Sequence, residues 1–496
     1  MLDEYGPSLS SALVQRLASS GVSQINGRQI VARGGQGIFS LKGIKFPHNE
    51  RFLYLGKDIK SARFWTALRR ALEEKRTAYG AALASLEVEG NRLFEYRFAI
   101  LSGSPNRLKG HLSYERILQR LLDVGLLVRT NHGKEQIITI APQTEAIAIS
   151  PQEFTARQVA ENIVIGGVKD WARKLGITSY GSGKTWDGVT TPLFGQFAWD
   201  FTGPSYVHPF VSYTNAKTVP GFVVADVILG EELAERHVEF FVRKTDMLRR
   251  QRRLRPFMAL LIADRFSPNA LRRARQRGLV FATPSLLFGK ALAAVLTELI
   301  QILKNAAAVA VTDPLKIHML FSKLTTIEGA AANLRGPLFE MIAAHIVSGA
   351  GGWVRIGEIV TDPTSGETAE IDVMQTRSDT VLVVECKGRL ATRTISLDEV
   401  QDWLGKKVPR LRNYLLYRYS NVPLRFEFWT TASFSSEATL FLERRKQDIQ
   451  KYEIGWKDGE AVVDELRKIN ATRLVEVINE HYRYAAVSLS GVTPLD

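Results

Sequence analysis

The sequence contains a single cysteine, Cys386. One thiol can form neither an intramolecular disulfide nor a thiolate zinc cluster, and chains without disulfides are typical of the reducing cytoplasm. The eight histidines are scattered, and no two of them stand at i, i+4 or at another ligand spacing, which argues against a histidine zinc site. We therefore expect any metal ion to be held by oxygen ligands.

Long apolar runs are also missing. Apolar runs such as AAAVAV at 306–311 are far shorter than the ~20 residues that a membrane span needs. The first residues, MLDEYGPSLS, show neither the basic nor the apolar region of a secretory signal. These absences predict a cytoplasmic protein with no membrane partner.

The composition is that of a folded protein with an excess of positive charge. The 496 residues, 45% hydrophobic and 23% charged, are enough for three or four domains. The 65 Lys and Arg outnumber the 51 Asp and Glu, and the formal charge is +8 over residues 1–150 and +7 over 251–300. Such an excess favours a polyanionic partner, with nucleic acid ahead of a membrane surface.

Residues 1–57 and 111–150 follow one pattern. Each begins with amphipathic helical sequence, such as SYERILQRLLDVGLL, and continues into alternating sequence typical of a strand hairpin. Both look like winged-helix modules, joined by a basic helical and β connector at 58–110. Such modules bind DNA, but helix pairs with a hairpin also dock proteins or dimerise. We expect DNA as a partner, and a second copy of the chain or operon-encoded proteins as further partners.

Residues 151–300 and 330–496 both alternate helical and strand-like segments in the same order, as α/β domains do. FGQFAWDFTG (194–203) and GFVVADVILG are expected strands of the first, and a helical linker at 301–329 separates the two. The predicted fold class is therefore a multidomain α/β protein with a degenerate internal duplication.

The segment AEIDVMQTRSDTVLVVECKG, residues 369–388, carries the strongest chemical signal. Side chains alternate between the two faces of a strand, so Glu385 and Lys387 share one face. The turn TRSD predicts a hairpin that brings Asp372 onto the strand next to Glu385. Two buried carboxylates repel each other unless a cation neutralises them, and Mg²⁺ prefers such oxygen ligands. An incidental surface salt bridge between Glu385 and Lys387 is the alternative.

An Asp, a hairpin and then Glu-x-Lys in a Val-rich strand resemble the PD-(D/E)XK nuclease superfamily, which has the restriction-endonuclease-like fold. The resemblance covers about residues 330–435, and Ile371 stands where many members have Pro. It implies that Asp372 and Glu385 are metal ligands for Mg²⁺, which Mn²⁺ can replace. It also implies that Lys387 orients or activates the attacking water and stabilises charge on the phosphate.

Two further site residues follow from the same resemblance. Glu340, in GPLFEMIAAHIV, matches the acidic residue of the superfamily's first helix, which contacts the metal directly or through water. The alternative is that Glu340 only favours the dipole at the start of a helix that begins at Pro337. Gln401, on the helix after the active strand, stands where several families place a polar residue.

The middle segment, residues 151–300, shows a weaker form of the Asp and Glu-x-Lys pattern. Asp200 and the VVADV strand are similar to Asp372 and VVECK, but Ala225 and Val227 stand where Glu and Lys are needed, and Asp226 is expected out of phase. We therefore expect residues 151–300 to be a degenerate nuclease-like domain. GSGKT at 181–185 lacks the first glycine of a phosphate loop.

The resemblance implies a Mg²⁺-dependent endonuclease, acting on DNA in restriction or antiphage defence. A repair or recombination nuclease is the alternative with the same chemistry. A non-catalytic DNA-binding regulator and a scaffold subunit of a larger complex are the alternatives without catalysis. Arginine runs at 248–255 and 271–278 are either a phosphate-binding surface or solvated helix faces.

Overall fold

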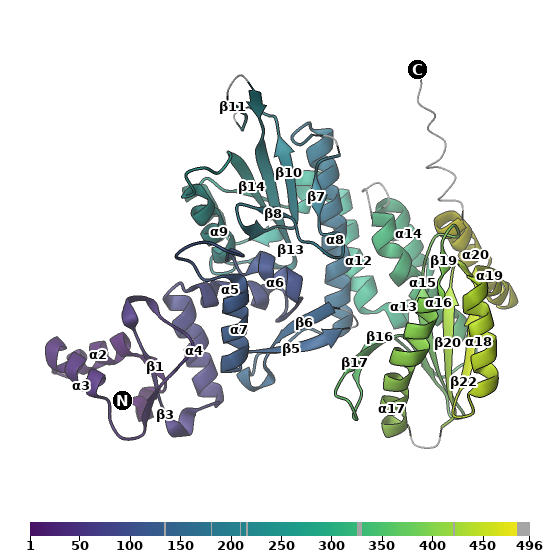
Figure 1. Ribbon diagram of the computed structural model, residues 1–496, viewed down its shortest axis with the longest axis horizontal. Helices are drawn as coiled ribbons and strands as arrows, with labels where there is room; N and C mark the ends of the chain where they lie inside the picture. Colours follow the sequence, from purple (N-terminus) through teal and green to yellow (C-terminus); the bar gives the residue numbers. More distant parts are fainter. Residues whose placement is uncertain are drawn as a thin grey trace. The chain divides into compact units, whose positions relative to one another are not determined.

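The computed structural model describes residues 1–132, 135–179, 181–208, 210–214, 217–324, 330–419 and 422–483 (Figure 1). About half of the chain is helical and about a quarter is in strands of mixed sheets, so the protein is a multidomain α/β protein. Residues 325–329 of the predicted linker and 484–496 of the last predicted domain lie outside the described residues.

The chain divides into two compact units, which we describe separately. Unit 1 contains Met1–Thr130, Glu135–Ile149 and Trp171–Leu287. Unit 2 contains Asn131–Lys134, Ser150–Asp170 and Phe288–Asp496.

Unit 1 begins with a small three-stranded module within the predicted segment 1–57. Its sheet has the order β1-β3-β2, and two helices lie between the first two strands in the sequence. The Ser23 side chain caps the second helix by accepting a hydrogen bond from the N–H of Asn26. The elements are α1 (Leu2–Tyr5), β1 (Ser8–Leu9), α2 (Ser10–Ser19), α3 (Gln24–Arg33), β2 (Ile38–Ser40) and β3 (Phe52–Leu55).

A second module has the same strand order, β4-β6-β5. Its first strand, β4, lies inside the predicted connector 58–110, so the module begins before residue 111, where the sequence placed its start. Three residues are too few to show a strand pattern, and only the pairing of β4 with β6 reveals the strand. The elements are α4 (Ala62–Glu74), α5 (Ala78–Val88), β4 (Arg92–Phe94), α6 (Glu95–Leu101), α7 (Tyr114–Val124), β5 (Leu127–His132) and β6 (Glu135–Ile140).

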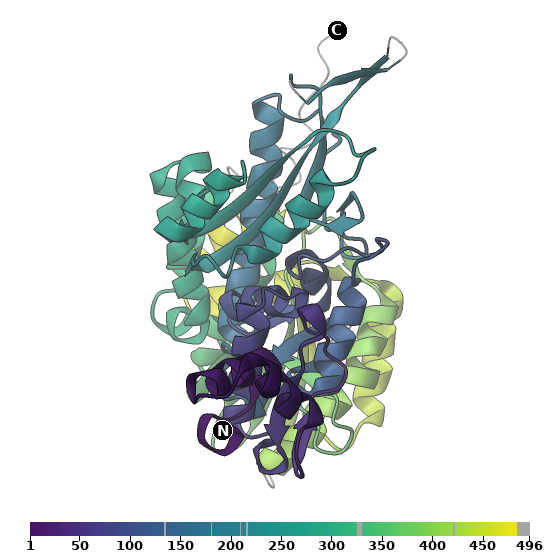
Figure 2. The same ribbon diagram turned by 90° about the vertical axis from the view of Figure 1, so that its left-hand side faces the viewer.

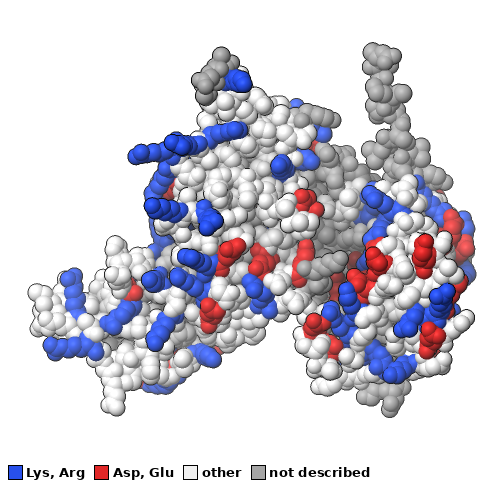
Figure 3. Space-filling model, viewed as in Figure 1, with Lys and Arg blue, Asp and Glu red and all other residues white. Residues whose placement is uncertain are grey.

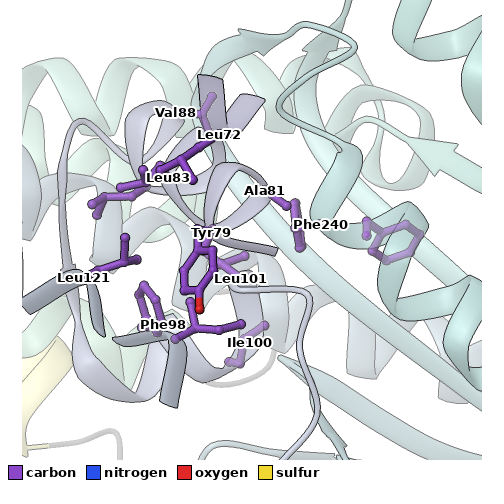
Figure 4. Packing of buried hydrophobic residues seen from close by; sticks show 14 of the residues in the cluster. Leu72, Tyr79, Ala81, Leu83, Val88, Phe98, Ile100, Leu101, Leu121 and Phe240 are labelled. Atoms are coloured by element: carbon purple, nitrogen blue, oxygen red, sulfur yellow. The ribbon is translucent and has the colours of Figure 1, made fainter. Parts of the chain in front are cut away.

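One hydrophobic core joins this second module to the middle sheet. Figure 4 shows Tyr79 and Leu83 of α5 packed near Phe98 and Leu121, with Phe240 of α9 nearby. The same cluster of buried side chains continues into the strands of the middle sheet. The two parts therefore depend on each other for burial of their apolar surface.

The middle sheet has five strands in the order β15-β14-β13-β10-β7. The β7/β10 and β10/β13 pairs are antiparallel, whereas β13/β14 and β14/β15 are parallel. The two long strands β13 and β14 run side by side through the sheet (Figure 2). The elements are β7 (Lys184–Thr185), β10 (Phe201–Ser205), β13 (Gly221–Leu233), α9 (Glu239–Arg249), β14 (Phe257–Phe266), α10 (Pro268–Gln276) and β15 (Val280–Ala282).

The strand predicted at 194–203 is interrupted. Gly195 and Gln196 both have positive φ, 59° and 72°, and they form a tight turn between β8 (Leu193–Phe194) and β9 (Phe197–Ala198). Gly195 takes this conformation freely because it has no Cβ. The strand that pairs with β13 starts only at Phe201.

The sheet of unit 2 has five strands in the order β16-β17-β18-β20-β22. Its β16/β17 and β17/β18 pairs are antiparallel, and its β18/β20 and β20/β22 pairs are parallel. The two sheets therefore share one strand order and one set of strand directions. The elements are β16 (Trp353–Thr361), β17 (Thr368–Thr376), β18 (Val381–Lys387), α16 (Leu397–Asp402), η4 (Trp403–Lys407), α17 (Val408–Arg418), β20 (Leu424–Thr430), α18 (Ser436–Asp448), β22 (Glu453–Lys457), α19 (Gly459–Lys468), α20 (Thr472–Ile478) and η5 (Asn479–Arg483).

Helices cover both faces of this second sheet. Buried side chains of α16, η4, α17 and α18 pack with alternate residues of β18 and β20 on one face. The opposite face is covered by α15 (Ala330–Ser348), whose Val347 carbonyl accepts a hydrogen bond from Gln375 of β17. Pro337 lies inside α15, so the helix does not begin there as the sequence predicted.

The remaining elements are short or connect the larger parts described above in the sequence. They are η1 (Pro47–Asn49), η2 (Gly56–Asp58), η3 (Pro142–Thr144), α8 (Pro151–Lys174), β11 (Ser212–Thr214), β12 (Lys217–Val219), α11 (Pro284–Phe288), α12 (Lys290–Lys304), α13 (Ala306–Thr312), α14 (Leu315–Leu324), β19 (Thr394–Ile395) and β21 (Ser433–Phe434). Within the described residues, no single helix has the length and apolar character of a membrane span, and α12 with α13 meets that criterion only as a pair bent by 91°.

Candidate functional site

Asp372 and Glu385 lie opposite each other on neighbouring strands. β17 and β18 are antiparallel, and the pairing of Val373 with Val384 makes Asp372 and Glu385 the next positions of this register. The backbone N–H of Cys386 donates a hydrogen bond to Asp372 Oδ2 at 2.7 Å. Both carboxylate residues are only 6% exposed, so the hairpin places two acidic groups together inside the domain.

Lys387 lies on the same face of β18 as Glu385. Val381 and Val383, the alternate residues before them, belong to the core under α16 and α17, which fixes the direction of this face. Lys387 Nζ donates a hydrogen bond to Glu385 Oε1 at 2.5 Å. Burial by itself would lower the pKa of Lys387, but the carboxylates of Glu385 and Asp372 raise it. Lys387 therefore carries its charge at neutral pH.

Cys386, between these two residues, is buried on the other face of the strand. Burial raises the pKa of its thiol well above the usual value, and the negative charges of Asp372 and Glu340 add to the effect. The thiol is therefore neutral and unreactive, as expected for a residue that packs in the core.

Lys407 is a member of the site that the sequence reasoning missed. It ends the π-helical turn η4, between α16 and α17. Its Nζ lies 3.0 Å from Asp372 Oδ1 and also forms an ion pair with Glu385. Burial alone would lower the pKa of Lys407, but Asp372 and Glu385 raise it strongly. In turn, burial would raise the pKa of Glu385, but Lys407 and Lys387 lower it to about 2.

The sequence does contain a signal for Lys407. Buried apolar residues repeat at helical spacing through this segment, and Lys407 stands seven residues after Val400 on the same stripe. A lysine on the stripe that faces a sheet is unusual unless it finds a partner. The π-helical turn adds a residue to one turn of the helix, a feature frequent at functional sites.

Glu340 and Glu370 add two further carboxylates. Burial raises the pKa of Glu340 well above its usual value, and the charges of Asp372 and Glu370 raise it further. Burial and the charge of Asp372 likewise raise the pKa of Glu370 to about 7. Glu340 therefore lies close to the predicted carboxylates. Glu370, which shares a strand face with Asp372, is a second residue that the sequence reasoning did not assign.

Gln401 does not join this group. Its side chain is exposed on α16, whereas the preceding residue, Val400, is buried against the sheet. One residue turns a helix by about 100°, so Gln401 points to solvent. The polar group that α16 and η4 bring to the carboxylates is Lys407 instead.

The assembled donor set suits a hard divalent cation. Four carboxylates from Glu340, Glu370, Asp372 and Glu385 face two ammonium groups, which leaves two negative charges in excess when all are ionised. Oxygen ligands from carboxylates are those that Mg²⁺ prefers. Burial raises the pKa of both Glu340 and Glu370, and the negative charge of Asp372 raises each further.

The middle sheet differs from the sequence expectation at one position. The register of β10 and β13 pairs Phe201 with Ala225 and makes Asp200 and Asp226 the next opposite positions. Asp226 is therefore in phase with Asp200, contrary to the prediction. Alignment of VVADV with VVECK by letters placed Asp226 at the position of Cys386. The register between two strands depends on both of them, so it cannot be predicted from either strand alone.

Lys184 and Thr185 of GSGKT form β7, so no helix follows to bind a phosphate.

Two histidines that are distant in the sequence meet in unit 2. His318 Nδ1 lies 3.1 Å from His481 Nε2, and the Glu480 carboxylate is near both rings. These three residues form a group that could hold a metal ion. The lack of a ligand spacing in the sequence argued against a histidine metal site. That argument concerns only residues close together in the chain, whereas these two histidines are 163 positions apart.

Comparison with known proteins gives little further information. No protein-family model matches the sequence, and no curated protein matches it. A solved structure titled "Crystal Structure of Protein of Unknown Function AF1548" aligns at 17% identity over 26% of this chain, with a TM-score of 0.20. The alignment spans 65% of that protein's length.

Proposed function

We propose that residues 330–483 form a Mg²⁺-dependent nuclease domain of the PD-(D/E)XK superfamily that hydrolyses phosphodiester bonds in DNA. The observation that carries the proposal is the group of Asp372 and Glu385 on opposite strands with Lys387 and Lys407 bound to them. The strand order and directions of this sheet support a restriction-endonuclease-like fold.

The chain's own residues supply most of the chemistry. Asp372, Glu385 and Glu340 would hold Mg²⁺, which when bound lowers the pKa of water and neutralises charge on the phosphate. The Cys386 N–H donates to Asp372 Oδ2 from the backbone, which restrains the orientation of this ligand. An ammonium group has three N–H donors, so Lys387 can donate to a phosphate oxygen as well as to Glu385. One P–O bond forms to the water oxygen while the bond to the leaving oxygen breaks.

DNA needs a separate positive surface, because residues 351–400 around the carboxylates carry a formal charge of −4. In unit 1, Arg249 at the end of α9 donates to the carbonyls of Arg277 and Gly278, just beyond α10. An arginine surface lies around the ends of α9 and α10, and blue side chains are seen over the α9 region at the upper left of the middle part of Figure 3. Its exposed members are Arg250, Arg252, Arg253, Arg255, Arg272 and Arg275.

The two N-terminal modules contribute to DNA binding in this proposal. Both have helices followed by a two-stranded hairpin, and the strand orders β1-β3-β2 and β4-β6-β5 are the same. This repeated topology supports winged-helix modules. The alternative role for these modules is docking of a partner protein. That role would be favoured if the modules captured a protein and substitutions in them left DNA affinity unchanged.

A plasmid cleavage assay tests the catalytic proposal. We expect cleavage in Mg²⁺ or Mn²⁺, none in EDTA and none in Ca²⁺ alone, because Ca²⁺ occupies oxygen ligands but activates water less. Asp372→Ala, Glu385→Ala and Lys387→Ala should abolish cleavage and leave DNA binding largely unchanged, since these groups act in the transition state. Gln401→Ala is the matched control because its side chain is exposed.

The outcomes separate the alternatives. Cleavage by Lys387→Ala at the wild-type rate, or full activity in EDTA, contradicts the assigned site. DNA binding without cleavage under any metal condition favours a regulator or scaffold. A role in restriction adds the expectation that methylated and unmethylated DNA are cut at different rates, whereas a repair nuclease should prefer nicked or branched substrates.

A further inference from the structure

The middle sheet of unit 1 repeats the geometry around Asp372. The opposite positions in its register are Asp200 and Asp226. The backbone N–H of Val227 donates to Asp200 Oδ2 at 2.9 Å, just as the N–H of Cys386 donates to Asp372 Oδ2 at 2.7 Å. In both sheets, therefore, the backbone N–H of the residue that follows the second acid donates a hydrogen bond to the carboxylate of the first acid.

A lysine completes the match. Lys244 lies on α9, the helix between β13 and β14, and its Nζ lies 2.7 Å from Asp226 Oδ2. Lys407 has the corresponding position on the helical segment between β18 and β20. Burial lowers the pKa of Lys244, and the negative charge of Asp226 offsets part of this decrease. Ile228, two residues after Asp226, replaces the lysine that stands two residues after Glu385.

The new element in unit 1 is Arg97 of α6. It is 1% exposed, and its guanidinium forms ion pairs with Asp200 Oδ1 and with Glu89 Oε1, the latter at 2.9 Å. Its Nη2 also donates to the Val227 carbonyl at 2.9 Å. Two carboxylates and one backbone carbonyl thus surround one positive group. Carboxylate and carbonyl oxygens of this kind form the usual ligand set of a hard divalent cation.

We propose that the middle sheet holds a second copy of the carboxylate centre in which the Arg97 guanidinium takes the place of a divalent metal ion. The copy is consequently metal-free and cannot cleave a phosphodiester bond. Three acids, Glu89, Asp200 and Asp226, face two positive groups, Arg97 and Lys244. Because Arg97 comes from the second N-terminal module, the same contact anchors that module to the middle sheet.

The proposal predicts that removing Arg97 opens a metal site. In Arg97→Ala, three buried acids face one ammonium group, which is costly. The melting temperature should fall by at least about 5 °C in EDTA and recover by several degrees at saturating Mn²⁺. Both measurements use full-length protein carrying Asp372→Asn and Glu385→Gln, so that the site in unit 2 cannot bind the metal.

The same background protein with Arg97 intact is the reference for thermal unfolding and for Mn²⁺ binding by electron paramagnetic resonance. We expect one additional bound Mn²⁺ per chain in Arg97→Ala. The second variant, Arg97→Met with Asp200→Asn, lowers the acid charge as well, and it should be more stable than Arg97→Ala in EDTA and gain no Mn²⁺. If Arg97→Ala folds only when Mn²⁺ is present, the proposal is supported.

Equal Mn²⁺ binding and an equal metal response in the reference protein and the Arg97→Ala variant would overturn the proposal. Failure of Arg97→Ala to fold with and without Mn²⁺, while the double variant folds, would also overturn it. These readouts do not involve cleavage. They therefore test the centre in unit 1 whatever the outcome of the nuclease assays.

Discussion

Lys407 Nζ lies 3.0 Å from Asp372 Oδ1, and the two residues are 35 positions apart in the chain. The contact joins the helical layer of unit 2 to the centre of its sheet. Lys407 also pairs with Glu385, so one ammonium group holds both acids. An ammonium group shared by two carboxylates holds them close together in a buried place.

Lys407→Ala should reduce cleavage by about 10²-fold or more, because it removes a fixed positive charge beside the reacting phosphate. Lys406→Ala is the matched control, since Lys406 is an exposed neighbour whose ammonium group pairs with Asp402 on the surface of the helix. Single-turnover cleavage at saturating Mg²⁺ measures the effect. A rate within twofold of wild type for Lys407→Ala would exclude a role for this residue in the reaction.

Glu370→Gln should make stability less sensitive to pH. The folded-state pKa of Glu370 is raised to about 7, so folding favours its protonated form and this contribution is lost as pH rises through 7. In EDTA we expect the variant to melt a few °C above wild type at pH 8 and much closer to it at pH 5. Equal melting temperatures at pH 8 would show that ionisation of Glu370 does not destabilise the folded protein.

Asp200→Ala should destabilise the protein without removing metal-dependent cleavage. It leaves the buried Arg97 guanidinium without one carboxylate, which costs about 3–5 kcal/mol. Asp200→Asn, which keeps the shape and one acceptor, should cost less. Thermal unfolding and plasmid cleavage below the melting transition check both parts. Loss of cleavage in a folded Asp200→Ala protein would instead make the middle sheet a second active site.

Substitution of the arginine surface should weaken DNA binding and reduce its salt dependence. Changing Arg250, Arg252 and Arg253 to Ala should lower the slope of log K against log salt by about 0.9 for each phosphate that is no longer neutralised. Arg467→Ala with Lys468→Ala, on exposed side chains of α19, is the control of similar charge. An unchanged slope would assign these arginines to solvent or to a protein partner.

A truncation of residues 1–150 is not a clean test of DNA binding. Buried residues between Leu9 and Ile140 belong to the same hydrophobic cluster as residues of the middle sheet, and Arg97 is bound to Asp200. Deletion would expose this core and a buried charge. Point substitutions at exposed arginines avoid both effects.

The sequence alone determined the hairpin at 369–388 and the residue types that converge there. Strand alternation has a period of two and the turn is short, so Asp372, Glu385 and Lys387 could be placed from local pattern. The alternation of helices and strands likewise indicated a multidomain α/β protein and a repeated order of elements. These features depend only on residues close together in the chain.

Tertiary structure decided which distant residues complete each centre. Lys407, at the end of a π-helical turn, lies against the acids, whereas Gln401 faces solvent. The phase of Asp226 depends on the register of β10 and β13, and Arg97 reaches Asp200 from 103 positions away. Register and long-range contact follow from packing of the whole unit, where burial forces each charged group to find a partner. A local apolar stripe indicates that Lys407 faces the sheet, but no local sequence pattern identifies the partners of Lys407 or Arg97.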